Sequence, residues 1–341
     1  MTNRAMRTAR RAGQTAGLAL SLALAAGLTV TAAKPAAAST NYILCGGSPG
    51  GLWSLLGAGL DAVVKEVDPA ATVTYQTSSG GFANIVQVSQ GKCDMAIVHV
   101  GEAVMAQRGE PPFDTPVDDF RTVAVLYDWA PMQWLVTKDF ADKHDLTSIA
   151  DLKTAEAPID LIVNRRGILP SILAQEALER AGITFNDIDG WGGAVQYHGS
   201  RTAAGVMKDR KADGWVNAMF IGTGAIADIA ESIDLTLLSV PDDVVSAMSE
   251  AYGSLPVVIP ADAYPWLEED VATFGARAAL VVSETMDEET VRALTAAMIS
   301  HIDKLQDVHA SMKALNVEVM RSADELPYHP GATAAYDAAA S

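Results

Sequence analysis

Three glycine-containing segments of the sequence have the composition of anion-binding turns. They span residues 46–51 (GGSPGG), 78–81 (SSGG) and 165–171 (RRGILPS), and each lies between a predicted strand and a predicted helix. The first N–H groups of a helix are unpaired and carry partial positive charge, which suits a carboxylate or phosphate. Glycine also lets a ligand approach the backbone closely. One such turn alone is usually an ordinary connection, but three of them favour a binding site.

The first turn also fits the nucleophile pattern G-x-S-x-G, with Ser48 as the serine. In that motif the residue after the serine donates its backbone N–H to the oxyanion. Here that residue is Pro49, which has no N–H. We therefore expect that the protein is not an enzyme. The alternative is an exported serine hydrolase that uses Ser48. The same glycines do not form the G-x-G-x-x-G dinucleotide fingerprint, because Ser48 replaces its second glycine.

No metal site or other cofactor is predicted from the histidines and cysteines. None of the six histidines has the spacing of a zinc motif, and His99 is of interest only because it ends a predicted strand. The two cysteines, Cys45 and Cys93, flank two predicted strands. If those strands are parallel neighbours, the cysteines are on the order of 10 Å apart, so we expect no disulfide between them.

Elements that would position these turns follow a β-α-β order, which indicates parallel strands with helical crossovers. An apolar stretch at 120–137 is interpreted as strands that cross into a second α/β unit, and a late strand at 274–282 returns from it. The predicted strands are 42–45, 72–76, 94–98, 160–163, 191–195, 214–220 and 235–239. The predicted helices are 52–67, 82–90, 171–181, 200–210, 225–232 and 287–305.

The N-terminus has the pattern of an export signal. Four arginines within residues 4–11 precede the apolar stretch 18–30, and three alanines at 36–38 offer a cleavage site. Residues 1–38 hold five basic and no acidic residues, so the rest of the chain carries 19 basic against 42 acidic side chains, a formal net charge of −23. Such a surface repels nucleic acid and anionic lipid. We predict a periplasmic product that binds neither.

Several segments resemble the extracytoplasmic receptors of TRAP (tripartite ATP-independent periplasmic) transporters, specifically the TAXI family. The resemblance covers essentially all of the chain after the signal. The segments that carry it are the 46–51 turn with Leu56-Gly57, residues 77–81 with Asn84-Ile85, the strand 91–98 (GKCDMAIV), residues 262–265 (DAYP) and the tail 326–332 (LPYHPGA). The sequence departs from the family after 160–163, where only Gly167 matches a polar glycine-rich turn.

This resemblance implies a bilobal α/β periplasmic-binding fold with a ligand cleft between two hinged lobes. We expect lobe one at 39–126 and 257–341, the latter with the C-terminal helices, and lobe two at 127–256. The resemblance also implies capture of a small organic anion, a carboxylate or acidic amino acid, and its delivery to a TRAP-type membrane permease. A ligand sensor that partners a signalling protein remains a second alternative.

Eight residues are predicted to contact the ligand. Hydroxyls and backbone N–H groups of the lobe-one turns can bind a carboxylate without a buried full charge. An arginine beside Gly167 can pair with a second carboxylate in bidentate fashion. The predicted residues are Ser48 and Gly50 in the first turn, Ser79, Gly80 and Gly81 in the second, His99 and Tyr127 at strand ends, and Arg166 in lobe two.

Overall fold

A computed structural model describes residues 40–47 and 52–341 of the chain. The predicted signal peptide and the site residues Ser48 and Gly50 lie outside the described residues. Within the described part, no helix combines the length and apolar character that a membrane crossing requires.

Parallel strands form the first half of the sheet. β1 (Asn41–Cys45) lies between β2 (Thr72–Gln76) and β3 (Met95–His99) and runs parallel to both. The carboxyl ends of parallel strands meet at one edge of a sheet, which is where ligands bind in open α/β folds. The first two glycine-containing turns follow β1 and β2, so both belong to this edge.

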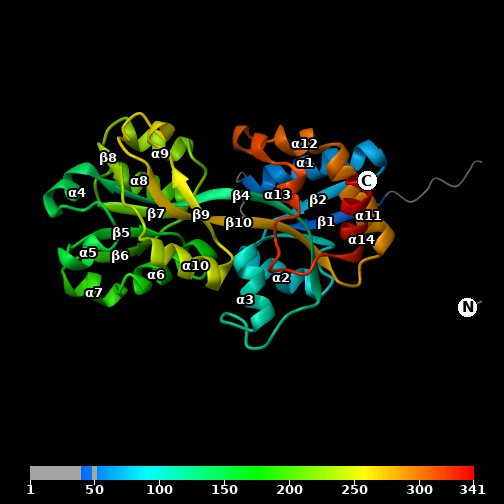
Figure 1. Cartoon of the computed structure of the whole chain (residues 1–341), viewed down its shortest axis with the longest axis horizontal. Helices are drawn as coiled ribbons and strands as arrows, with labels where there is room; N and C mark the ends of the chain where they lie inside the picture. Colours follow the sequence, from blue (N-terminus) through cyan, green and yellow to red (C-terminus); the bar gives the residue numbers. More distant parts are fainter. Residues whose placement is uncertain (1–39, 48–51) are drawn as a thin grey trace, which may run out of the picture. The chain divides into compact units, whose positions relative to one another are not determined.

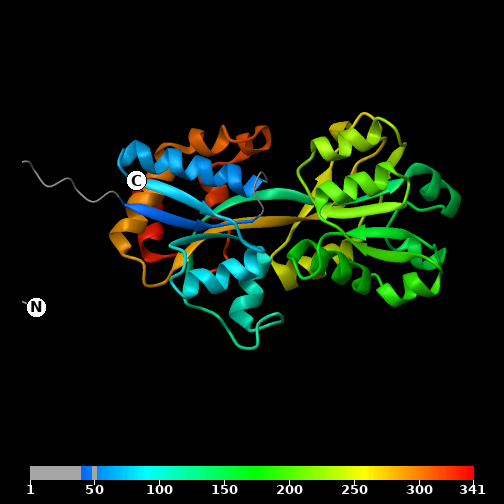
Figure 2. The same ribbon diagram turned by 180° about the vertical axis from the view of Figure 1, so that it is seen from behind.

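Side chains of β3 alternate between two cores, as the pleat of a strand requires. Met95 and Ile97 pack with α1, whereas Ala96 and Val98 pack with α2 and α3 on the other face. Both views in Figures 1 and 2 show α1 and α3 on opposite sides of this sheet. We call this part lobe one. Its helices are α1 (Leu52–Val67), α2 (Gly81–Ser89), α3 (Val100–Arg108), α11 (Glu288–Ser300), α12 (Ile302–Gln306), η2 (Ala310–Ala314), α13 (Val317–Met320) and α14 (Pro330–Ala339).

Two long strands continue the sheet out of lobe one. β4 (Phe120–Thr137) has 18 residues and β10 (Val271–Ser283) has 13, and they pair antiparallel. Their pairing is irregular, with register shifts around Ala278. Figure 1 shows both strands running from lobe one into a second group of elements. The chain thus crosses between the two groups on neighbouring strands.

The second group, lobe two, repeats the parallel α/β pattern. β5 (Asp160–Val163) lies between β6 (Ala194–Tyr197) and β7 (Gly214–Ala218), and β7 pairs antiparallel with β4. Side chains again alternate between two cores. Two short strands, β8 (Leu235–Leu237) and β9 (Leu255–Ile259), pair with β4 and β10. The helices are α4 (Lys138–His144), α5 (Asp151–Thr154), α6 (Leu169–Arg180), α7 (Phe185–Gly190), α8 (Ser200–Lys208), α9 (Gly224–Ala230), α10 (Asp242–Tyr252) and η1 (Ala261–Ala263).

The predicted mixed α/β architecture is confirmed, most elements begin or end a few residues from their predicted bounds, and two differ for a visible reason. The strand predicted at 191–195 forms at Ala194–Tyr197, because Gly192 takes a positive φ of 94° and turns the chain first. The single helix predicted at 287–305 is two helices, because the backbone of His301 leaves the helical region at φ −122°.

The expectation that the two cysteines are not bonded is wrong. Cys45 and Cys93 form a disulfide, with their Cα atoms 5.9 Å apart. A separation of about 10 Å would require Cys93 to lie in line with the third strand. In the structure β3 begins only at Met95, and Cys93 lies in the turn between α2 and β3. Cys45 pairs with Ala96 of β3, and the chain just before β3 brings Cys93 within bonding reach of Cys45.

The tail that carries much of the family resemblance has a structural role. The imidazole of His329 is buried, its Nδ1 accepts from the backbone N–H of Gly331, and its Nε2 lies 3.0 Å from the carbonyl of Met286. The backbone N–H of His329 donates to the carbonyl of Thr122 in β4. The tail motif therefore fastens the start of α14 to the long crossing strand.

Candidate functional site

Tyr75 anchors the backbone of the first glycine-containing turn. Its ring lies close to Gly46 and Gly57, and a Cβ atom added to Gly46 would overlap it. The Tyr75 hydroxyl accepts a hydrogen bond of 2.6 Å from the N–H of Gly47. Glycine is required here for close approach of a ring. Tyr75 was not predicted as part of the site, since Gly47, to which it is hydrogen-bonded, is 28 residues away along the chain.

A buried amide joins the first two turns. Asn84, in α2, donates to the carbonyls of Gly46 (3.1 Å) and Ile97 (2.7 Å). The hydroxyl of Ser78 lies 2.5 Å from Oδ1 of Asn84 and accepts from the N–H of Gly80. All three strand ends of lobe one are therefore held together by one small polar network. A fixed set of turns can present backbone N–H groups to a ligand without reorganising.

The second turn holds three of the predicted site residues. Ser79 is exposed, and Gly80 has a φ of +129°, which side-chain-bearing residues rarely adopt. A Cβ atom on Gly80 would come within 3.8 Å of Ile168 in lobe two. The second turn and the 165–171 turn, from opposite lobes, therefore lie face to face.

Gly81 provides room for a carboxylate of the protein itself. A Cβ atom on Gly81 would overlap the carboxylate of Glu102, which is 1% exposed. The first turn of α2 therefore already has a negative charge beside it.

His99 ends β3 and is the N-cap of α3. Its Nδ1 lies 3.1 Å from Oε2 of Glu102, and its backbone N–H donates to the same oxygen at 2.8 Å. The ring packs against Trp53 with centroids 4.9 Å apart. The side chain is 14% exposed, so one edge of the imidazole reaches the solvent-accessible surface.

Tyr127, in the crossing strand β4, connects the aromatic side chains of both lobes. Its hydroxyl accepts from the indole N–H of Trp53 at 3.1 Å, and its ring packs edge-to-face on Phe220 of lobe two, with centroids 5.1 Å apart. Burial raises the pKa of Tyr127 to about 12, and the charge of Glu102 adds to that shift. The hydroxyl therefore keeps its proton at neutral pH and is available as a donor.

A chain of amides lines the strand ends of lobe two. Asn164, just after β5, donates to Oδ1 of Asn217 in β7 at 2.8 Å. Asn217 in turn donates to the hydroxyl of Ser200 at the start of α8 at 3.2 Å. Asn217 is 3% exposed, which is unusual for an amide in a strand. Its position within an otherwise apolar stretch is the signal that could have identified it from the sequence.

Arg166 lies in the turn that faces Gly80. Its guanidinium carbon is 3.8 Å from the centre of the Tyr197 ring, a cation–π contact. The side chain is exposed, and no carboxylate within the described ranges forms an ion pair with it. The cation is thus oriented by an aromatic ring while its charge is not neutralised.

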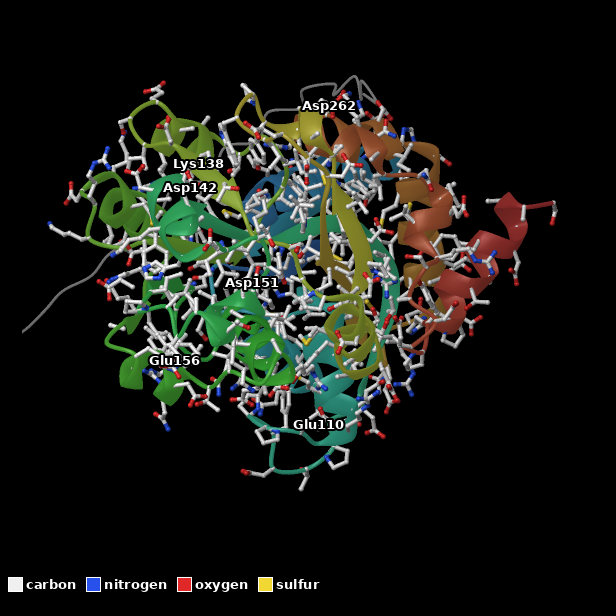
Figure 3. All side chains as sticks on the ribbon, turned by 60° about the vertical axis from the view of Figure 1, so that its left-hand side comes forward. Glu110, Lys138, Asp142, Asp151, Glu156 and Asp262 are labelled. Atoms are coloured by element: carbon white, nitrogen blue, oxygen red, sulfur yellow. A yellow bond between two sulfur atoms is a disulfide. The ribbon has the colours of Figure 1, made fainter. Side chains whose placement is uncertain are left out.

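Most carboxylates lie elsewhere on the surface. Figure 3 shows Glu156 and Asp262 pointing outward from different elements of lobe two, and Lys138 paired with Asp142 on α4. No group of three or more potential metal ligands occurs in residues 40–47 and 52–341. The described site therefore offers hydrogen-bond donors and, in Arg166, an exposed cation without an ion pair among the described residues.

Comparison with known proteins gives both a family and a fold. A model of the NMT1-like family matches residues 44–338. MatC from Rhodopseudomonas palustris, solved with bound malate, aligns at 14% identity over 88% of this chain and 95% of that chain, with a TM-score of 0.54. A TctC solute-binding protein from Polaromonas, without ligand, aligns at 15% identity over 85% and 89%, with a TM-score of 0.51. No curated protein matches.

At these identities the solved structures show a shared fold and nothing finer, and they confirm the predicted bilobal solute-binding fold. The narrower assignment to TAXI receptors stays a prediction. Because the family model spans nearly all of the described residues, the chain belongs to the NMT1-like family.

Proposed function

We propose that this protein is a periplasmic receptor that captures a small organic anion between its two lobes and delivers it to a TRAP-type membrane permease. One observation carries the proposal. The second turn of lobe one and the 165–171 turn of lobe two face each other, with Gly80 opposite Ile168, and Arg166 lies beside that contact with no carboxylate partner among residues 40–47 and 52–341.

The negative net charge of the chain makes a cation such as Arg166 useful for attracting an anionic ligand. With a formal net charge of −18 for the full sequence, the protein repels an approaching anion over most of its surface. A guanidinium held against Tyr197 provides a local attraction and a fork of donors that matches a carboxylate. Arg166 would hold one end of the ligand from lobe two.

Neutral donors would hold the ligand from lobe one. Ser48, Gly50 and Ser79 would contact the ligand through hydroxyl or backbone N–H groups, because unpaired N–H groups at the start of a helix favour anions. The protonated hydroxyl of Tyr127 adds a donor at the crossing strand. Closing two lobes over the ligand excludes water and strengthens each of these polar contacts.

Hinge closure would take place on the crossing strands. β4 and β10 are irregularly paired around Ala278, close to Tyr127. Where the regular hydrogen-bonded pairing of two strands is interrupted, backbone angles can change at a low cost in free energy. We expect the lobes to move as rigid bodies about these strands.

The fold similarity to MatC supports an organic acid as the ligand. MatC, which shares the fold, was solved with malate, a dicarboxylate. The export pattern of residues 1–38 supports a periplasmic location.

A thermal-shift screen tests the proposal. The chain from Ser39 onward is heated with L-malate, succinate, 2-oxoglutarate, L-glutamate and glutarate, and with a neutral sugar as control. An acid at one hundred times its dissociation constant stabilises the fold by about 2.7 kcal/mol, a shift of several degrees. The proposal fails if none of the acids shifts the transition, or if the protein hydrolyses ester substrates and Ser48→Ala abolishes that activity.

A further inference from the structure

Two strand-to-helix turns of lobe two lie side by side at the carboxyl edge of its sheet. One is the 165–171 turn after β5, which places Ile168 opposite Gly80 of lobe one. The other follows β6, the parallel neighbour of β5, and leads through Gly199 into α8. A Cβ atom on Gly199 would lie 3.8 Å from the side chain of Arg165. The start of α8 is therefore next to the turn that faces lobe one.

The direction of the hydrogen bonds at this edge follows from one backbone group. The N–H of Arg165 can only donate, and its nitrogen lies 2.7 Å from Oδ1 of Asn164. The Asn164 side chain is thereby oriented, so its amide nitrogen donates to Oδ1 of Asn217. The amide nitrogen of Asn217 then faces Ser200 and donates to the hydroxyl oxygen. Each side chain in this series is oriented by the one before it.

The series leaves the hydroxyl hydrogen of Ser200 available. A serine hydroxyl has one hydrogen to donate, and its oxygen can accept at the same time. The oxygen of Ser200 accepts from Asn217, which is 3% exposed. Within residues 40–47 and 52–341, no acceptor receives the Ser200 hydrogen, and Ser200 itself is exposed. The series of buried and half-buried amides therefore ends in an exposed donor.

We infer that Ser200 donates a hydrogen bond to the ligand from lobe two, and that Asn217 is the positioning residue that keeps the hydroxyl hydrogen available for it. This inference rests on the proposed function and narrows its ligand class. The Ser200 hydroxyl, oriented in this way, and the guanidinium of Arg166 are both donors. The end of the ligand that enters lobe two would therefore carry acceptors alone. A deprotonated carboxylate is such a group, and an ammonium group is not.

Serine variants test the contact itself. Calorimetric titration uses whichever of L-malate, L-glutamate and 2-oxoglutarate binds the unmodified protein most tightly. Ser200→Ala should weaken binding about tenfold or more, because a hydrogen bond to a charged group is lost. Ser200→Thr keeps a hydroxyl and should stay within about threefold of the unmodified protein. Ser246→Ala is the matched control, since it removes an exposed hydroxyl that donates to the carbonyl of Asp242 in α10.

A double-mutant cycle tests the role of Asn217. Asn217→Asp keeps the size of the side chain, but the new carboxylate only accepts, so the Ser200 hydroxyl would donate to it instead of the ligand. Ser200→Ala should then change affinity by less than about twofold in Asn217→Asp, against about tenfold in the unmodified protein. If Asn217→Asp does not fold, Asn217→Leu replaces it, and Ser200→Ala should cost about threefold or less there. An equal loss in both backgrounds overturns the positioning role.

The outcomes separate this inference from the proposed function. A tenfold loss in Ser200→Ala that is absent in Ser200→Thr and in Ser246→Ala supports the contact. An acid that binds the unmodified protein and Ser200→Ala equally overturns the contact, while the proposed function stands. If none of the three acids binds the unmodified protein, the proposed function fails, and the ligand contact of Ser200 fails with it.

Discussion

At the scale of single residues, Arg166 is the side chain on which anion capture most depends. Its guanidinium packs on the ring of Tyr197, whereas that of the exposed Arg180 forms an ion pair with Glu176. A cation–π contact orients the guanidinium without satisfying its hydrogen-bond donors. Those donors remain available for a carboxylate.

Arg166→Ala should therefore weaken binding of an organic acid by about 1.5–3 kcal/mol, tenfold to roughly 150-fold, because a charged hydrogen bond is lost. Calorimetric titration measures it. Arg180→Ala is the matched control, since that arginine ends α6, the helix that follows the turn of Arg166, and pairs with Glu176. Unchanged affinity in Arg166→Ala would mean that lobe two binds the ligand by other groups.

Individual residues were predictable where the residues next to them in the sequence indicated their role. The glycines at 80 and 81 were identified from a strand–turn–helix pattern, and the structure gives each a separate reason: a positive φ for Gly80 and room for Glu102 at Gly81. The amide pair of Asn164 and Asn217 was not identified. Its members are 53 residues apart and meet only because β5 and β7 are neighbours.

At the scale of elements, α1, β2 and β5 have the predicted bounds. Each has a clear apolar periodicity between turn-forming residues, so local sequence decides its ends. The Cys45–Cys93 disulfide was predicted wrongly, because it depends on the path of a turn that strand spacing does not describe. The break at His301 was missed for a similar reason, since the amphipathic pattern continues across it.

Two glycine substitutions test whether helix starts are built around Glu102. Gly81→Ala should destabilise the protein by about 1–3 kcal/mol, because the new methyl group overlaps the Glu102 carboxylate. Gly205→Ala, in α8, is the control. Its Cβ atom would meet nothing within 4 Å, so it should stabilise the protein by about 0.5–1 kcal/mol. Denaturant unfolding gives both values, and equal effects would contradict the observed packing.

At the scale of the whole molecule, one buried cation connects the two lobes. The guanidinium of Arg277, in β10, donates to the carbonyl of Gly253 at the end of α10 (3.2 Å) and to Glu325 near the C-terminus (2.6 Å). It also donates to the carbonyl of Ser322. Burial raises the pKa of nearby Asp128, and the charge of Arg277 partly offsets that shift. Lobe two is thus fastened to lobe one beside the strands proposed as the hinge.

The bilobal fold was predictable because local hydrophobic patterns indicate the order of strands and helices. The late predicted strand also indicates that the chain returns to the first sheet. The ligand was not predictable to the same degree. It depends on how side chains such as Arg166, His99 and Tyr127 come together from separate elements.

Calorimetric titration of the chain from Ser39 onward with L-malate, L-glutamate and 2-oxoglutarate tests the central claim most directly. The account predicts that at least one of these acids binds reversibly at a single site per chain, is recovered unchanged, and loses affinity in Arg166→Ala but not in Arg180→Ala. Absence of binding heat with all of the acids, or chemical conversion of the bound acid, would contradict a receptor for small organic anions.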